Sequence, residues 1–355
     1  MAMLTTVSTE DLIPAEHPIR KIRVVVDTIL DELDPVFDGM YATGGRTSVP
    51  PEALLKATVL MAMYSIRSER AFCERLNYDL LFKWFLDMRI DQLAFDPTTF
   101  TKNRKRLLEH AVADEFFAAV VRQAKLRRYI SSDHFSVDGT LLKAWASHKS
   151  FKPKDGPPSE PPEGRNVEVD FKKEKRSNAT HASTTDPEAR LYRKSHNTGA
   201  ELCFSGHLLM EHRSALIVGA ELTFADGYAE RATALEMLGR LPTTARRRTV
   251  AGDKGYDTKG FVAQARALGF TPHLAQNNTR QRSAIDGRTT RHDGHATSIR
   301  IRKRIEEPFG WIKTIAGGRQ LRYRGRDRNR DWFKITAAVY NMIRITALDN
   351  QQALA

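Results

Sequence analysis

Three acidic side chains lie in local sequence that could bring them together at a sheet edge and on a helix face. Asp138 lies in FSVDGTLLKAWA and Asp253 in TVAGDKGYD, and each follows a short apolar run that predicts a buried strand. Glu306 lies in the strongly basic segment RIRKRIEEPFGWIK. Carboxylate oxygens suit Mg²⁺, and two divalent ions about 3.5–4 Å apart can stabilise both oxygens of a phosphodiester exchange. The three acids therefore predict metal-dependent chemistry on a phosphodiester.

The basic segment around Glu306 is predicted to be a helix with one cationic face. Residues four and seven apart return to the same side of a helix, so Arg302 and Lys313 flank Glu306. Glu307 points about 100° away and has a single cation at the same offsets, so Glu306 is the better candidate. Pro308 could kink this helix. The apolar spacing on both sides of the proline favours a helix that runs through.

Each acid also has an ordinary structural interpretation. A lone Asp at the end of a strand is more often a turn or cap residue. Asp253 also has Lys254 beside it as a local partner, and Glu306 alone would most often form a surface ion pair. The prediction of a metal site therefore depends on all three acids occurring in this order on these elements.

Charge and composition restrict the class of partner. The chain has 355 residues and a net charge of +13, which favours nucleic acid or an acidic membrane surface. No apolar run approaches the roughly 20 residues of a spanning helix, and no secretory leader is evident. Cys73 and Cys203 form no zinc pattern, and the absence of a GxxxxGK loop predicts no ATP. We therefore expect a reduced, cytoplasmic protein that binds nucleic acid and not a membrane.

The order of predicted elements indicates an α/β (α+β) protein with two domains. Residues 1–130 predict helices that bind DNA or dimerise, and 131–349 predict a mixed sheet with helices on both faces. Within the second domain, 149–190 is poor in apolar residues and is expected to be a disordered or DNA-ordered insertion, whereas 350–355 is a tail. The predicted strands are 133–145, 201–211, 214–224, 248–252 and 270–275, with helices at 229–241 and 259–268. This is the plan of ribonuclease-H-like nucleases.

The motifs around the three acids resemble those of bacterial insertion-sequence DDE transposases, in the large group named after insertion sequence five. VDGT around Asp138 resembles the first block, and GDKGYD around Asp253 resembles the second. The third block, Tyr-x2-Arg-x3-Glu-x6-Lys, matches the segment around Glu306, with Ile299 in the position of the Tyr. The resemblance covers nearly the whole chain. The spacings are 115 residues (253 − 138) and 53 residues (306 − 253), and the shorter one leaves little room for a large insertion domain.

The resemblance implies a reaction, a cofactor and partners. The three acids would bind two Mg²⁺ or Mn²⁺ ions, and water would nick double-stranded DNA at the end of the element. The freed 3′-hydroxyl would then attack target DNA by transesterification. Arg302 and Lys313 would hold phosphates or flanking bases, with help from Lys254. Because two ends need two sites, a homodimer on DNA is expected, associated with the bacterial nucleoid.

Further basic residues are predicted to contact DNA. The segment TTFTKNRKRLLEH presents Lys102, Arg104 and Lys105, a set suited to phosphates and base edges, although a solvated basic helix face explains it equally well. A dense array of arginines follows the Glu306 segment and includes Arg322 and Arg324. This array predicts a track along the DNA backbone.

Two other functions remain open at this point. A metal-dependent nuclease of the same fold would cut without joining, and a regulator without catalysis would only bind DNA. The presence of all three acids and both flanking cations favours an enzyme over a regulator. The resemblance alone separates a transposase from a nuclease.

Overall fold

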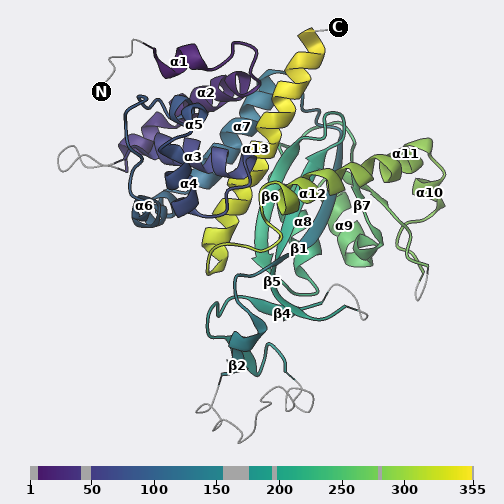
Figure 1. Ribbon diagram of the computed structural model, residues 1–355. Helices are drawn as coiled ribbons and strands as arrows, with labels where there is room; N and C mark the ends of the chain where they lie inside the picture. Colours follow the sequence, from purple (N-terminus) through teal and green to yellow (C-terminus); the bar gives the residue numbers. More distant parts are fainter. Residues whose placement is uncertain (1–6, 41–48, 155–175, 194–197, 279–281, 354–355) are drawn as a thin grey trace, which may run out of the picture.

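The computed structural model describes residues 7–40, 49–154, 176–193, 198–278 and 282–353. Helices form one side of the molecule and a mixed sheet the other, and one long helix runs between them (Figure 1). The first part of the chain folds into α1 (Thr9–Leu12), α2 (Ile19–Asp38), α3 (Pro51–Met63), α4 (Glu69–Leu76), α5 (Leu80–Phe85), α6 (Thr98–Glu109) and α7 (Val112–Leu126). The predicted helical N-terminal part is thus confirmed. No described helix combines the length and apolar character needed to cross a membrane.

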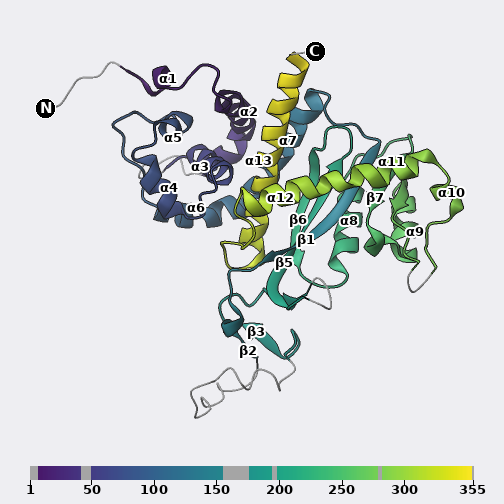
Figure 2. The ribbon, with the colours of Figure 1, turned by 45° about the vertical axis from the view of Figure 1, so that its right-hand side comes forward.

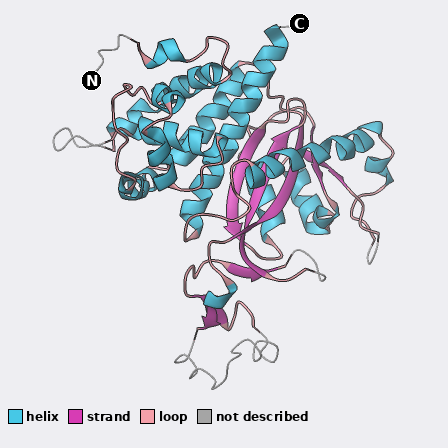
Figure 3. Ribbon diagram, viewed as in Figure 1, coloured by secondary structure: helices cyan, strands magenta, loops and turns pink. Residues whose placement is uncertain are grey.

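The strands form a six-stranded mixed sheet (Figure 3). Its members are β1 (His134–Lys143), β4 (Arg190–Tyr192), β5 (Glu201–Glu211), β6 (Ile217–Phe224), β7 (Arg248–Gly252) and β8 (Phe270–Leu274). β5 lies antiparallel to β1, β4 and β6, whereas β7 lies parallel to β1 and β8. The hairpin-type strands followed by crossover units give the order β6-β5-β1-β7-β8, with β4 also paired to β5, and the predicted mixed sheet is confirmed.

Helices cover both faces of this sheet. On one face, Phe135 and Val137 of β1 pack in a core with α8 (Ala229–Gly239) and α9 (Lys259–Ala267). On the other face, alternate residues such as Leu142 pack with α12 (Glu306–Thr314) and α13 (Arg326–Ala353). Figure 2 shows α11 (Asp293–Arg302) and α12 end to end across the sheet. Because successive side chains of β1 point to opposite faces of the sheet, odd-numbered residues such as Phe135 contact one helical layer and even-numbered residues such as Leu142 contact the other.

The helical part and the sheet share one hydrophobic core through α13. Buried residues of this helix, among them Phe333 and Val339, join the core that also contains Leu33, Leu60 and Phe116. α13 contacts α2, α3 and α7 as well as β6. The predicted domain boundary near residue 130 stays a prediction, because this core extends across it.

The predicted tail at 350–355 is wrong over residues 350–353, which continue α13. The hydroxyl of Tyr129 donates to Asp349 Oδ1 at 2.6 Å and also lies 3.0 Å from Gln352 Oε1. Lys21 donates to the side chain of Asn350. These polar contacts hold the end of the helix against the N-terminal part.

The predicted disordered insertion at 149–190 is also wrong in part. β2 (Phe151–Pro153) pairs with β3 (His181–Ser183), and β4 joins the main sheet. Phe151 is buried and stacks on His181 with 5.4 Å between ring centroids. The Asn178 side chain exchanges two hydrogen bonds of 2.9 and 2.7 Å with the backbone of Leu191. Local polar contacts thus order a segment with few apolar residues, while 155–175 lie outside the described residues.

Candidate active site

Asp138 and Asp253 lie where β1 and β7 part. The two strands pair only from His134↔Thr249 to Ser136↔Ala251. Asp138 is two residues beyond the last pair, and Asp253 directly follows β7. β1 continues along β5 beyond this point, so the edge that β7 leaves lies beside both acids. Two neighbouring strands thus bring together acids that are 115 residues apart (253 − 138).

The Asp138 carboxylate lies in a strongly acidic setting. Burial raises its pKa to about 6, and the nearby charges of Asp253 and Glu230 add to this increase. The Gly139 N–H, which donates to Asp138 Oδ1 at 2.9 Å, opposes the increase, as does the positive charge of Arg302. Carboxylates that destabilise one another's ionised forms are a donor set that a divalent cation would neutralise.

Asp253 also has the turn role that its position predicts. Its Oδ1 accepts from Gly255 N at 2.7 Å and so caps the short 3-10 helix η3 (Lys254–Tyr256). This bond fixes the carboxylate at the end of β7. Lys254 is exposed on the same turn. The cap and a metal-binding role are compatible, since a carboxylate has a second oxygen.

Glu230 is an acid near this site that the sequence analysis missed. It lies in the first turn of α8, on the opposite face of the sheet from α12. A Cβ added to Gly139 would lie 2.4 Å from Glu230 Oε1, so the glutamate side chain lies directly against β1 beside Asp138. An acid in the first turn of a helix is normally explained by the helix dipole, which is why its sequence position alone gave no signal.

The basic segment does not form one continuous helix. α11 ends at Arg302, a 3-10 turn, η4 (Lys303–Ile305), follows, and α12 begins at Glu306. Pro308 is the third residue of α12, where a missing N–H removes no intrahelical bond. The helix is therefore interrupted before Glu306. Pro308 does not interrupt α12, which continues from Glu306 to Thr314.

The cationic face of this segment nevertheless lies over β1. Lys313 Nζ donates to Thr140 Oγ1 at 2.5 Å, and Thr140 shares the face of β1 that carries Asp138. Arg302 lies near enough to Asp138 to lower the pKa of that acid. Its Nε is buried and has no hydrogen-bond partner among the described residues. The two cations thus flank the part of β1 where the acids gather.

Glu306 and Glu307 are both exposed at the start of α12, and their directions differ. Burial raises the pKa of the Tyr340 phenol on α13, and the negative charge of Glu307 adds to this increase, so Glu307 faces α13. Glu306 is seven residues before Lys313 and therefore points toward the same side as that lysine. Within the described residues, no three Asp, Glu, His or Cys side chains already stand as metal ligands.

The predicted DNA-contacting residues of α6 have different environments. Arg104 Nη2 lies 2.5 Å from Glu69 Oε1, and its guanidinium lies 4.2 Å from the centroid of the Tyr323 ring. These contacts tie α6 to α4 and give Arg104 a structural role. Lys102 and Lys105 are exposed and remain accessible to DNA.

The arginine array after α12 is not a continuous surface track. Arg322 is half-buried and lies 5.7 Å from the Trp332 ring centroid, and burial lowers the pKa of its guanidinium. Arg330 pairs with Asp114 and with the buried Glu221, and only 26% of its side chain is exposed. Arg324 is exposed. The sequence showed the density of cations but not that the fold uses several of them internally.

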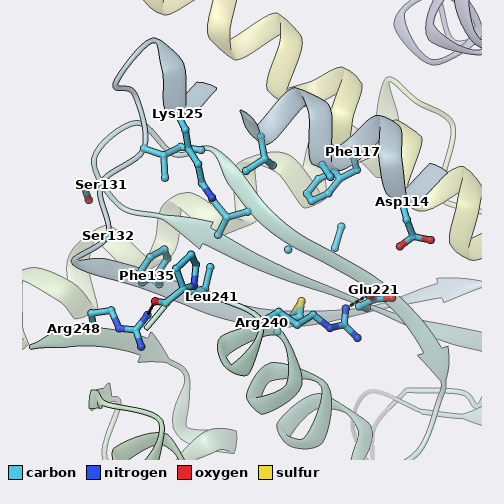
Figure 4. A pocket seen from close by; sticks show the side chains of 18 of the residues that line it. Asp114, Phe117, Lys125, Ser131, Ser132, Phe135, Glu221, Arg240, Leu241 and Arg248 are labelled. Carbon is cyan, nitrogen blue, oxygen red and sulfur yellow. Dashed lines mark hydrogen bonds and ion pairs between the residues drawn. The ribbon is translucent and has the colours of Figure 1, made fainter. Parts of the chain in front are cut away.

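A cavity of about 620 Å³ lies apart from the acids, between α7, β6 and the end of α8. Asp114 and Glu221 line one end, and Arg248 and Phe135 line the other (Figure 4). None of the residues predicted to bind metal or DNA lines it. The acids predicted from the sequence therefore lie away from this cavity, with Asp138 and Asp253 at the edge where β1 and β7 part.

Comparison with known families gives two matches along the chain. Residues 132–342 match the family model described as "Transposase DDE domain", and residues 7–106 match "Transposase domain (DUF772)". No curated protein has a matching sequence.

Two solved structures align with most of the chain at low identity. A piggyBac transposase synaptic complex with hairpin DNA has a TM-score of 0.44 and 9% identity, over 94% of this chain and 76% of that one. A Mos1 mariner paired end complex with Mn has a TM-score of 0.20 and 10% identity, over 86% of this chain and 98% of that one.

Proposed function

This chain belongs to the DDE transposase family and is an enzyme that cleaves DNA and transfers strands, and we propose that Asp138, Asp253 and Glu306 hold its divalent ions. The observation that carries this proposal is the meeting of Asp138 and Asp253 at the parting of β1 and β7. The donor set is entirely carboxylate, which suits Mg²⁺ or Mn²⁺, and two ions per site are proposed. The glutamate approaches from α12, and the three carboxylates would have to draw together around the ions.

Each group of the site has a proposed task. Bound divalent ions would supply Lewis-acid stabilisation of the attacking and leaving oxygens. Asp138 and Asp253 would hold these ions at the sheet, and Glu306 would do so from the helix. Arg302 and Lys313 would bind the phosphates on either side of the scissile bond, because their positive charges flank this part of β1.

The proposed substrate is double-stranded DNA, as the ends of the element and as the target. Lys102 and Lys105 on α6, Lys254 beside the acids and Arg324 are exposed cations that would contact its backbone. A homodimer on DNA is proposed, since two ends need two sites. We propose no role for ATP, because the sequence has no GxxxxGK loop.

A strand-transfer assay with purified protein, labelled element ends and Mg²⁺ tests this proposal. Joined products are expected from the wild-type protein. Ends that are cut but never joined would favour a nuclease, and ends that are bound without cleavage would favour a regulator.

The matched pair Glu306→Gln and Glu307→Gln tests the assignment of the third acid. Glu306→Gln is expected to abolish cleavage while end binding persists. The substitution removes the negative charge of a proposed metal ligand but keeps the size of the side chain. Glu307→Gln is expected to do far less, because Glu307 faces Tyr340. The opposite ranking would refute the assignment of Glu306.

A further inference from the structure

The opening between β1 and β7 admits side chains from both faces of the sheet. The last β1–β7 pair is Ser136↔Ala251, so Asp138 and Gly139 have no β7 residue opposite them. α11 contacts β1, β7 and β8 from one face, and α8 contacts β1, β5 and β6 from the other. An acid at the beginning of α8 and an acid on α12 therefore approach this part of β1 from opposite faces of the sheet.

Gly139 shows how closely Glu230 approaches this opening. A Cβ at position 139 would lie 2.4 Å from Oε1, 2.6 Å from Cγ and 2.9 Å from Cδ of Glu230. Gly139 is not among the described residues with positive φ, so the backbone conformation does not demand glycine there. The close approach of Glu230 does demand it. The residue after Asp138 thus has no side chain because the carboxylate of Glu230 occupies that space.

The beginning of α8 is also tied to the turn that carries Asp253. Arg231 Nη1 donates to Gly255 O at 3.2 Å, and Gly255 N donates to Asp253 Oδ1 at 2.7 Å. Asp226 Oδ1 accepts from the backbone at the start of the helix, at 2.8 and 2.6 Å. The position of Glu230 is therefore fixed relative to both β1 and the end of β7.

Tyr256 is a buried residue close to the same three acids. Its ring is buried behind the turn, and burial raises the pKa of its phenol. The negative charges of Glu230, Asp138 and Asp253 all add to that increase, with Glu230 the largest of the three. A single buried phenol thus lies within electrostatic reach of all three carboxylates. Glu230 itself is exposed, so an ion from solvent can reach it.

We propose that Glu230 is a fourth metal-holding carboxylate of this site, placed across the sheet from Glu306. This inference rests on the proposed function. Glu230 supplies a hard oxygen donor on the face where the DDE acids supply none. With Glu230, four carboxylates surround the opening and match the charge of the two divalent ions proposed above.

Mn²⁺ binding to the full-length protein without DNA tests this inference, with free Mn²⁺ followed by electron paramagnetic resonance. Glu230→Gln is expected to weaken the affinity roughly tenfold or more, since even residues that only support metal ligands are worth about 10–100-fold. Glu236→Gln is the matched control, because Glu236 lies on the same helix with 64% of its side chain exposed. Its affinity is expected to equal that of the wild type.

Thermal unfolding with and without Mn²⁺ separates metal binding from a purely structural role. Mn²⁺ is expected to raise the melting temperature of the wild type and of Glu236→Gln, and to raise that of Glu230→Gln much less. If Glu230→Gln does not fold, Glu230→Asp, which keeps the charge but withdraws it by one methylene, is expected to show the same weakened binding. Wild-type affinity in the folded Glu230 variant overturns the inference and leaves the proposed function intact. A wild-type protein that binds no Mn²⁺, or an Asp138→Asn variant that binds it normally, overturns both.

Discussion

A buried ion cluster joins the helical part of the molecule to the sheet, and its removal should cost several kcal/mol. Glu221 on β6 has a side chain that is only 8% exposed. Its Oε2 lies 2.8 Å from Arg330 Nε, and its Oε1 lies 3.1 Å from Lys334 Nζ. Asp114 on α7 binds the same two cations, with both of its oxygens 2.8 Å from Arg330. Arg240, directly after α8, also pairs with Glu221, at one end of the cavity in Figure 4.

The expected loss of unfolding free energy depends on the charges that Glu221→Gln leaves without their partner. Truncating one member of a buried pair costs about 3–5 kcal/mol, because the partner charges remain buried. Asp114 still neutralises part of the charge of Arg330 and Lys334, so the lower end of this range, about 3 kcal/mol, is expected at pH 7. Glu201→Gln is the matched control. Glu201 on β5 pairs with Lys143 at 2.8 Å, but the two side chains are 49% and 41% exposed, and such surface pairs are worth about 0–1 kcal/mol.

The effect should also depend on pH in a stated direction. Burial opposes ionisation of Glu221, but Arg330, Lys334 and Arg240 outweigh it and lower its pKa below the usual 4.5. A lowered pKa in the folded state means that the stabilisation is complete above the unfolded-state value and is lost as the pH falls through the folded-state value. The difference between wild type and Glu221→Gln should therefore be largest at pH 6–8 and shrink below about pH 4.

Urea unfolding followed by circular dichroism measures these free energies at pH 7 and below pH 4, at about pH 3. Equal losses for Glu221→Gln and Glu201→Gln at pH 7 would refute the reasoning, as would a loss for Glu221→Gln that stays constant with pH. Either result would mean that the buried cluster contributes no net stability.

Three further predictions concern the site and the core. Gly139→Ala should weaken Mn²⁺ binding and lower the melting temperature, because the new Cβ would lie 2.4 Å from Glu230 Oε1, whereas Gly260→Ala in α9, with nothing within 4 Å, should bind Mn²⁺ normally. Asp331→Asn should raise the melting temperature at pH 8 but not at pH 4: burial raises the pKa of Asp331 to about 7, so the stability of the folded state falls as the pH rises through that value. Chelation by EDTA should abolish cleavage of labelled ends and leave a gel shift with the same DNA, because the basic surface does not depend on the metal.

The sheet could be predicted from the sequence because its strands are short apolar runs with clear boundaries. The strand predicted at 248–252 is observed over those residues, and the mixed character of the sheet followed from hairpin-type strands succeeded by crossover units. Asp138 and Asp253 were placed near each other because each is next to one of these strands. The local pattern of apolar residues was thus enough to locate the strands and the acids that directly adjoin them.

The remaining features depend on contacts between distant residues. Glu230 approaches Gly139 only because α8 packs back on the sheet, and nothing in its local sequence records that approach. Arg330 and Arg104 resembled free cations, yet the acids that bind them lie far away in the sequence. The break at η4 likewise escaped detection, since the apolar spacing continues through it. Charge in a sequence shows how many cations exist, and tertiary packing decides which of them face solvent.

The packing of α13 against the first helices has a consequence for how the protein is made. The core around α7 needs residues that the ribosome adds about 200 positions later (326 − 126 = 200). At about 5–20 residues per second, the N-terminal helices would wait roughly 10–40 s for their last partner, with apolar surface open to chaperones and proteases. A copy cut short by a premature stop before α13 would lack this partner altogether. Such fragments would keep the apolar face of their helices exposed, which is the feature that quality-control proteases recognise.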